Sequence, residues 1–182
     1  MLNILKKSLF VICILSLIGC NSNQQPITCP QPVIHPNVQQ PKIEIYFTPG
    51  TDCEDNIIKR INNSKTIDIA VYSITNPNIA DSIISAHNRG ATIRIITDKG
   101  QAKVKGAKAE ELKSAGIPLV TNKSHKIEHN KFAIFDGIHM VSGSYNWTTN
   151  ASKNNSENCL FFDQPNKEYS KRFEYLWDLY NK

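Results

Sequence analysis

The sequence predicts a single α/β domain with a mixed, largely parallel β-sheet and helices on both faces. Between residues 42 and 116, short β-rich runs alternate with longer amphipathic runs. Such alternation is typical of a parallel sheet covered by its crossover helices. From residue 130 to 162, short apolar runs meet at a tight turn, which predicts antiparallel pairing. About 140 residues from Lys42 onward are enough for one buried core.

The first strand and helix are predicted from the run KIEIYFTPG and the residues after it. This run alternates in hydropathy and then breaks at Pro49-Gly50. Thr51 and Glu54 have the spacing of a capping box, which predicts that a helix begins there. Its apolar stripe would be Ile57, Ile58 and Ile61.

Two further strand–helix pairs follow. KTIDIAVYSI is β-rich and largely apolar, as expected of a strand buried on both faces. Asn76-Pro77 predicts the start of a helix with Ile79, Ile83 and Ile84 on one side, and Gly90 predicts its end. ATIRIITD is the next strand, and GAKAEELKSAG is a third helix closed by Gly116.

The second half of the domain has a different pattern. NKFAIFDG and HMVSGS flank a short turn at Asp136-Gly137, and ENCLFF adds another strand. After Pro165, apolar residues recur at helical spacing, which predicts a core-facing helix. They are Tyr169, Phe173, Leu176, Trp177 and Tyr180.

The N-terminus has the layout of a secretory signal over residues 1–19. Lys6 and Lys7 precede an apolar run that is too short to favour a spanning helix. The ending Leu-Ile-Gly-Cys resembles the lipobox of bacterial lipoproteins, which implies that Cys20 is acylated and becomes the first mature residue. The resemblance implies an exported, membrane-anchored protein facing the periplasm or the cell exterior. An ordinary secretory signal or an uncleaved apolar N-terminus is the alternative.

Residues 20–41 are predicted to form a tether between the lipid and the domain. Residues 21–41 contain no Asp, Glu, Lys or Arg but have five prolines and five glutamines, so they cannot build a core.

Charge and cysteine content give weaker indications. The formal net charge is +5, and lysines are concentrated between residues 99 and 131. Such a run is most often a solvated face, although lysines this close to a candidate site could also attract a polyanion. Cys29, Cys53 and Cys159 allow at most one internal disulfide, with no pairing predicted.

The candidate chemistry lies between residues 129 and 146. If residues 129–136 form a strand, His129 and Lys131 project from one face, whereas Asp136 points to the other. An imidazole beside an ammonium suits an anionic substrate. Ser144 and Asn146 add hydroxyl and amide donors that fit phosphate oxygens. No second histidine or carboxylate falls at ligand spacing on that face, so no metal site is predicted.

The pattern H-x-K-x4-D-x6-G-S-x-N runs from His129 to Asn146, and its Gly is Gly143. It is the signature of the phospholipase D superfamily. AVYSITNPNIADSIISAHNRGATIRIITD, SAGIPL and NNSENCLFF also resemble the small, single-motif bacterial nucleases of this superfamily. The resemblance covers roughly residues 43 to 162 and implies the phospholipase D/nuclease fold.

The resemblance also implies a mechanism without metal or other cofactor. His129 would attack phosphorus to form a phosphohistidine, while Lys131, Ser144 and Asn146 hold the non-bridging oxygens. Glu157 falls where the family has an acid that hydrogen-bonds the histidine. We interpret Asp136 as holding the strand and turn in place. Two-motif members use a second histidine as general acid, so a single-motif chain is expected to form a homodimer with both His129 side chains at the interface.

Three functions remain open from the sequence. The favoured one is a phosphodiesterase, most simply an endonuclease, with nucleic acid (DNA, or RNA) as substrate. The second is a phospholipase D or phosphatidyl transferase, because the chain is predicted to be membrane-tethered. Against it, the sequence shows no amphipathic loop or apolar patch near the motif. The third is a surface-binding lipoprotein with a relic site, which the intact motif and Glu157 disfavour.

Overall fold

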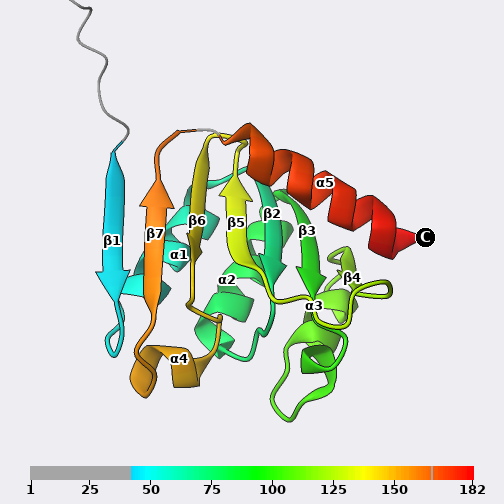
Figure 1. Cartoon of the computed structure of the whole chain (residues 1–182), viewed down its shortest axis with the longest axis horizontal. Helices are drawn as coiled ribbons and strands as arrows, with labels where there is room; N and C mark the ends of the chain where they lie inside the picture. Colours follow the sequence, from blue (N-terminus) through cyan, green and yellow to red (C-terminus); the bar gives the residue numbers. More distant parts are fainter. Residues whose placement is uncertain (1–41, 165) are drawn as a thin grey trace, which may run out of the picture. The chain divides into compact units, whose positions relative to one another are not determined.

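The structure is a computed structural model that describes residues 42–164 and 166–182. The predicted signal peptide (1–19), the tether (20–41), Cys20 and Cys29 lie outside these residues. The strands of the described domain are β1 (Ile43–Phe47), β2 (Thr66–Val71), β3 (Thr92–Thr97), β4 (Leu119–Thr121), β5 (Lys131–Phe135), β6 (His139–Gly143) and β7 (Asn158–Phe162). They form a seven-stranded sheet in the order β1-β7-β6-β5-β2-β3-β4 (Figure 1).

The sheet is mixed, as predicted, but the expectation of a largely parallel sheet is wrong, because four of its six neighbouring strand pairs are antiparallel. β2, β3 and β4 pair in parallel, whereas the remaining neighbours pair antiparallel. β1, β2, β3, β4 and β6 therefore run in one direction, and β5 and β7 in the other. The first strand does not join the parallel part but pairs with β7 at the sheet edge. The short β4, within a stretch where no strand was predicted, extends the parallel edge.

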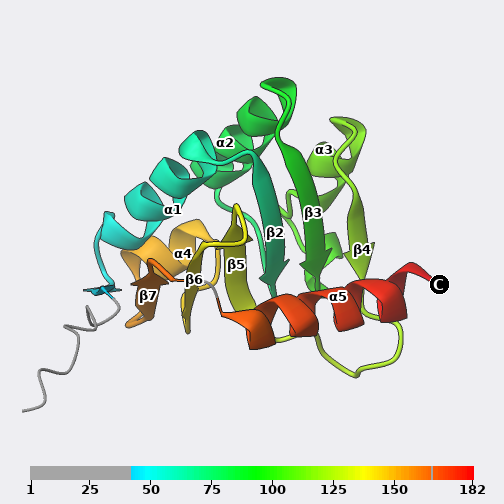
Figure 2. The same cartoon turned by 90° about the horizontal axis from the view of Figure 1, so that it is seen from above.

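Helices cover both faces of the sheet, as predicted. They are α1 (Asp52–Asn63), α2 (Pro77–Asn88), α3 (Ala109–Ser114), α4 (Thr149–Lys153) and α5 (Lys167–Asn181). Figure 2 shows α1, α2 and α3 on one face and α5 on the other. The unpredicted α4 connects the end of β6 to the start of β7. None of these helices, within the residues the structure describes, is both long and apolar enough to cross a bilayer.

The structure tests the predicted starts of α1 and α2. The side chain of Asn76 accepts hydrogen bonds from the N–H groups of Asn78 and Ile79, so the start of α2 is confirmed. The capping box at Thr51 is wrong, because Thr51 makes no side-chain cap and has helical backbone angles. Glu54 is instead buried and accepts hydrogen bonds from Asn78 Nδ2 (2.7 Å) and Ser152 Oγ (2.9 Å). The Glu54 carboxylate is thus held by tertiary hydrogen bonds and does not form the predicted local cap.

The core lies in two layers separated by the sheet. Ala133 and Phe135 belong to the larger layer, which packs under α1 and α2, and Phe132 and Ile134 belong to the layer under α5. The alternation predicted for residues 129–136 is therefore confirmed over residues 132–135, within β5. The C-terminal helix is also confirmed, with Phe173, Leu176 and Tyr180 buried and Tyr169 and Trp177 packed at its margin.

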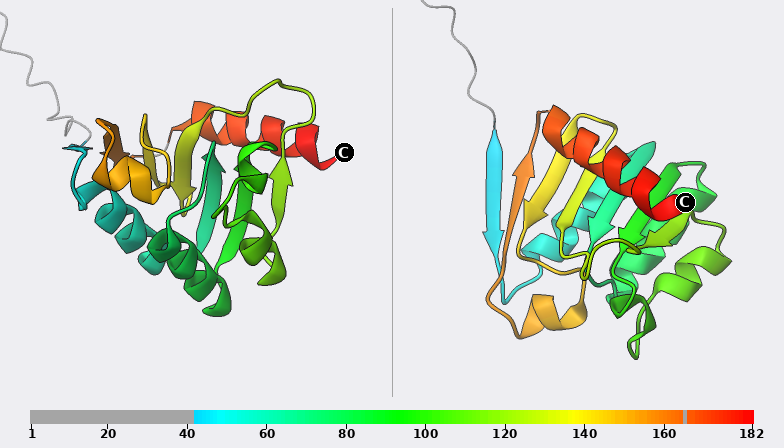
Figure 3. Two further views of the ribbon diagram at one scale, coloured as in Figure 1. Left: turned by 90° about the horizontal axis from the view of Figure 1, so that it is seen from below. Right: turned by 45° about the vertical axis from the view of Figure 1, so that its right-hand side comes forward.

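The α5 layer covers only part of its face of the sheet. Its core contacts come from β2, β3, β4 and β5, and Figure 3 shows the helix lying across these strands and away from β1. On β1, the alternate residues Ile43, Ile45 and Phe47 are 45%, 52% and 68% exposed. We call these three residues the β1 apolar stripe. It ends at Phe47, next to Thr48.

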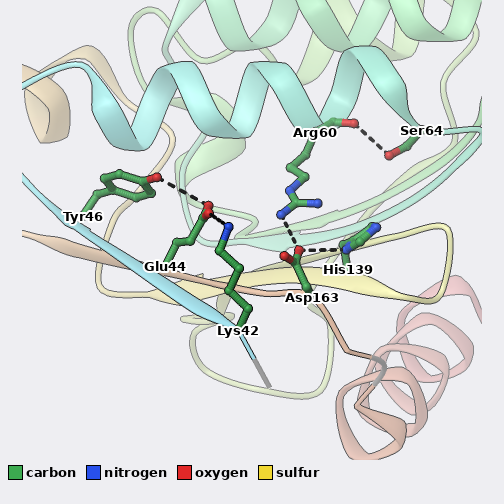
Figure 4. A network of polar contacts seen from close by, with 7 residues as sticks. All are labelled: Lys42, Glu44, Tyr46, Arg60, Ser64, His139 and Asp163. Carbon is green, nitrogen blue, oxygen red and sulfur yellow. Dashed lines mark hydrogen bonds and ion pairs between the residues drawn. The ribbon is translucent and has the colours of Figure 1, made fainter. Parts of the chain in front are cut away.

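A disulfide and an ionic network join β7 to its neighbours. Cys53 at the start of α1 is bonded to Cys159 in β7. At the opposite end of β7, Asp163 Oδ1 accepts a hydrogen bond from Arg60 Nη2 (2.5 Å) and contacts His139 Nδ1 (3.0 Å), as Figure 4 shows. His139 is therefore a half-buried residue of β6 with an acidic partner.

Candidate active site

One cleft of about 390 Å³ lies at the sheet edge where β6 ends and β5 and β7 begin. All five residues predicted to act in catalysis or phosphate binding line it, together with the glycine of the motif. They are His129, Lys131, Ser144, Asn146, Glu157 and Gly143. Residues from three strand ends thus meet at one edge of the sheet.

His129 and Lys131 lie at the start of β5. The N–H of Tyr72 donates to the carbonyl of Asn130 (2.8 Å), which extends the pairing of β2 with β5 past its last ladder residue. The ring of Tyr72 meets that of His129 edge to face, with 4.6 Å between centroids. His129 itself is exposed to solvent. One side of the imidazole therefore packs against the Tyr72 ring, and the other side is open to a substrate.

Four neighbouring groups stabilise the ammonium of Lys131. Its Nζ donates to the carbonyl of His129 (2.8 Å) and lies 5.1 Å from the centroid of the Tyr72 ring. Burial lowers the pKa of Lys131, and the negative charges of Glu157 and Glu128 partly oppose that shift. A carbonyl, an aromatic face and two carboxylates thus compensate for the cation beside His129.

Gly143 is required where β6 leaves the sheet. Its φ angle is 153°, and a β-carbon there would fall on the backbone carbonyl of Asn158. That carbonyl accepts hydrogen bonds from the N–H groups of Ser144 (3.1 Å) and Tyr145 (3.2 Å). The missing side chain therefore allows the chain to turn against β7 and brings Ser144 to the cleft.

The hydroxyl of Ser144 has a donor left for a ligand. Its Oγ accepts a hydrogen bond from the N–H of Asn158 (3.1 Å). Because a hydroxyl accepts and donates at once, its own proton remains available to a phosphate oxygen.

Asn146 is held through its neighbours. The N–H of Trp147 donates to the carbonyl of Ser73 (3.1 Å), and the carbonyl of Trp147 accepts from Thr75 and Asn76. Among the described residues, the buried Oδ1 of Asn146 has no hydrogen-bond partner. Because buried polar atoms are nearly always paired, this amide keeps hydrogen-bonding capacity for a ligand in the cleft.

Glu157 lines the cleft through a different set of contacts from those implied by the family. Its N–H donates to Thr48 Oγ1 (2.9 Å), and its Oε1 accepts from Asn155 Nδ2 (2.9 Å). Within the described residues, no hydrogen bond joins its carboxylate to the ring of His129. Its electrostatic effect in this structure falls on Lys131.

Asp136 lies outside the cleft, at the far end of β5. Its Oδ1 accepts hydrogen bonds from the backbone N–H groups of Lys65 (2.8 Å) and Thr66 (2.9 Å), and its φ angle is 54°. The carboxylate thus ties the β5–β6 turn to the start of β2.

The other described histidines do not reach the cleft. Nδ1 of His125 lies 2.6 Å from the hydroxyl of Tyr180, and His139 is at the opposite end of β6 beside Asp163. Of the histidines in the described residues, His129 is the one that lines the cleft.

Tyr72 and Thr48 contribute to the site but were not identified from the sequence. Tyr72 directly follows β2, and Thr48 directly follows β1. Both lie far in sequence from the motif, which runs from His129 to Asn146. A polar residue just after a predicted strand that ends at the same sheet edge is the signal that could have found them.

The described residues also bear on metal binding. No group of three or more His, Cys, Asp or Glu residues that could hold a metal ion occurs in residues 42–164 or 166–182. The donors in the cleft are an imidazole, an ammonium, a hydroxyl and an amide, with one carboxylate. This set fits a phosphate and is poor in metal ligands.

Fold and site together define a class. Residues 57–177 match the family model described as "Cardiolipin synthase, PLD-like domain", and the chain belongs to this phospholipase D-like family. Over 119 residues it is 37% identical to a mitochondrial cardiolipin hydrolase of Chlamydomonas reinhardtii, an alignment that covers 64% of this chain and 53% of the relative. Over 160 residues it is 30% identical to a phospholipase D of Rickettsia felis, with 85% and 79% covered.

Solved structures show the same fold. A phospholipase D family member, Nuc from Salmonella typhimurium, superposes with a TM-score of 0.72 at 25% identity, covering 78% of this chain and 97% of that one. NucT from Helicobacter pylori gives a TM-score of 0.72 at 25% identity, with 78% and 98% covered. The α/β fold predicted from the resemblance is thereby confirmed.

Proposed function

We propose that this protein is a phosphodiesterase that hydrolyses nucleic acid through a phosphohistidine formed on His129. The observation that carries the proposal is the convergence of His129, Lys131, Ser144 and Asn146 on one cleft. It offers a nucleophile together with a cation and neutral donors for phosphate oxygens, which are the groups that phosphoryl transfer needs.

The first step forms a bond between phosphorus and a ring nitrogen of His129 and breaks the bond to the leaving oxygen. Lys131, Ser144 and Asn146 bind the non-bridging oxygens, whose negative charge grows in the transition state. A second histidine donates a proton to the leaving oxygen. In the second step, water gives up a proton to that histidine and attacks phosphorus, which releases His129 and the product phosphate ester.

The second histidine comes from another copy of the chain, in a homodimer. Within the described residues the cleft contains one histidine, and this histidine is exposed. The β1 apolar stripe supplies uncovered apolar surface that ends at Phe47, beside the Thr48 that binds Glu157. A two-fold dimer that joins two clefts would bury such a surface and complete the site.

Nucleic acid is favoured as the substrate by the charge around the cleft. Four of the lysines that precede the motif in the sequence line a hollow that is also lined by Tyr72. Phosphate contacts of this kind position a strand without reading its bases, so little base specificity is expected.

A second candidate is hydrolysis of membrane phospholipids. The sequence showed no apolar patch near the motif, but in the fold the exposed Phe47 lies close to the cleft. Relatives named cardiolipin hydrolase and phospholipase D also favour this candidate.

The protein is exported and held at a membrane by lipid on Cys20. The Cys53–Cys159 disulfide supports this placement, because such bonds persist in oxidising compartments. Cys20→Ser should abolish incorporation of labelled fatty acid and leave the precursor uncleaved. Continued labelling of a mature protein would contradict the anchor.

The substrate test uses the full-length protein in detergent with excess EDTA. Plasmid DNA, RNA and mixed micelles of phosphatidylcholine or cardiolipin are supplied separately. The proposal predicts cleavage of nucleic acid that chelation does not reduce. Activity confined to lipid would favour the second candidate, and loss on chelation with recovery on adding a divalent ion would contradict the mechanism.

A further inference from the structure

A second hollow of about 510 Å³ adjoins the catalytic cleft. Its rim is basic. The cationic side chains that line it are Lys99, Lys103, Lys123 and Lys126, together with His125, which is cationic only when protonated. We call it the lysine pocket.

The lysines stand on two loops that are braced against each other. Oδ1 of Asn122 accepts a hydrogen bond from the N–H of Lys99 (2.7 Å), and its Nδ2 donates to the carbonyl of His125 (2.9 Å). Asp98 accepts from the N–H groups of Gly100 (2.8 Å) and Gln101 (3.0 Å). Asn122 and Asp98 are both buried, so the backbones that carry the lysines are fixed.

Most of this positive charge is not neutralised within the domain. Lys99, Lys103 and Lys126 form no ion pair with the described residues. Lys123 donates to the backbone oxygen of Lys182. The acid in the pocket wall, Asp98, already accepts from backbone N–H groups through both carboxylate oxygens. The pocket is therefore built to receive an anion.

Tyr72 links the lysine pocket to the catalytic cleft through its contact with His129, which lines the cleft. Tyr72 itself lines the lysine pocket, and its ring packs against His129. Its hydroxyl accepts a hydrogen bond from Gln101 Nε2 (3.1 Å), which links it to the loop of Lys99 and Lys103. A polyanion bound over His129 can therefore continue across Tyr72 into the pocket.

We propose that the lysine pocket binds a second phosphate of the nucleic-acid strand whose scissile phosphate lies over His129. The inference rests on the proposed function and adds to it a subsite outside the motif. Each phosphate contact releases counterions, so the pocket should make strand binding strongly dependent on salt.

The test compares two pairs of substitutions in the full-length protein in detergent. Lys99→Gln/Lys103→Gln removes two charges from the pocket. Lys59→Gln/Lys65→Gln removes two charges from exposed positions outside both hollows. Each protein is assayed on a single-stranded oligonucleotide, on bis(p-nitrophenyl) phosphate, which has one phosphate, and on cardiolipin and phosphatidylglycerol vesicles.

The pocket pair should reduce kcat/KM on the oligonucleotide by on the order of tenfold more than on the small diester. It should also lower the slope of log affinity against log salt by about 0.7 for each lysine–phosphate pairing that the substitutions remove. The control pair should match wild type on both substrates. Equal loss on the two substrates, or none on the oligonucleotide, would overturn the subsite.

The lipid arms separate this inference from the proposed function. Cardiolipin has two phosphates. If the pocket pair loses activity on cardiolipin but none on the oligonucleotide, the pocket binds lipid, and the proposal that it binds a nucleic-acid phosphate is overturned. If wild type cleaves the small diester and vesicles but no oligonucleotide, the proposed substrate fails and the strand assignment fails with it. If wild type cleaves the oligonucleotide and the pocket pair behaves like the control, only the subsite fails.

Discussion

Gly143 lies so close to Asn158 that a β-carbon on the glycine would overlap the asparagine's backbone carbonyl. The same carbonyl receives the N–H groups of Ser144 and Tyr145. The contact therefore joins the ends of β6 and β7 and positions the hydroxyl that faces the cleft.

Gly143→Ala should lower both stability and activity. The clash and the unfavourable φ angle should together cost about 2–4 kcal/mol of unfolding free energy, and the shift of Ser144 should reduce kcat/KM. Gly106→Ala is the control, because Gly106 also has positive φ (82°) but open space around it. Denaturant melts and kinetics on both variants measure the difference. Equal effects in the two variants would show that backbone strain alone, and not the contact with Asn158, is responsible.

The fall of activity at high pH should follow the deprotonation of Lys131. Burial lowers the pKa of Lys131, whereas Glu157 raises it, and only the protonated amine stabilises the phosphate. Activity should therefore fall as pH rises through this lowered pKa. Glu157→Gln removes a charge that favours the cation, so this fall should move to lower pH. The measurement is kcat/KM against pH for wild type, for Glu157→Gln and for Glu110→Gln as a remote control. An unchanged pH dependence in Glu157→Gln would show that these two residues do not interact.

The Cys53–Cys159 disulfide should contribute measurably to stability. It joins residues 106 positions apart, and closing such a loop restricts the unfolded chain by about 2–5 kcal/mol. Dithiothreitol should lower Tm of wild type but leave Tm of the Cys53→Ala/Cys159→Ala variant unchanged. Thermal melts with and without reductant measure this. A wild type that melts identically in both conditions, with its thiols shown to be reduced, would contradict the expectation.

The sequence predicts the structural roles of some residues better than those of others. The alternation of residues 132–135 and the helix start at Asn76-Pro77 depend on local geometry, and both are confirmed. The capping box at Thr51 is wrong, because Glu54 pairs with residues from α2 and α4 that are distant in sequence. Tyr72 enters the site only because β2 and β5 are neighbours in the sheet. Strand order and tertiary hydrogen bonds have no local pattern in the sequence, so these parts required the structure.

The dimer should be visible in mixtures of active and inactive chains. If each site takes one His129 from each of two copies, a mixed dimer keeps only half a site. Co-expression with an excess of His129→Ala chains should reduce the activity further than dilution of the wild-type chains alone would. Sedimentation of the wild type should give twice the mass of one chain. His139→Ala is a matched control, since that histidine lies at the opposite end of the sheet beside Asp163. A monomeric, active wild type or a strictly linear mixing curve would contradict the dimer.

The covalent intermediate tests the central claim most directly. Wild-type protein is mixed with a labelled oligonucleotide in excess EDTA, quenched after milliseconds to seconds, digested and mapped by mass spectrometry. We predict an acid-labile nucleotidyl adduct on the peptide that contains His129, and none in His129→Ala. Oligonucleotide cleavage without any adduct on His129, or with an adduct on another residue, would contradict the account.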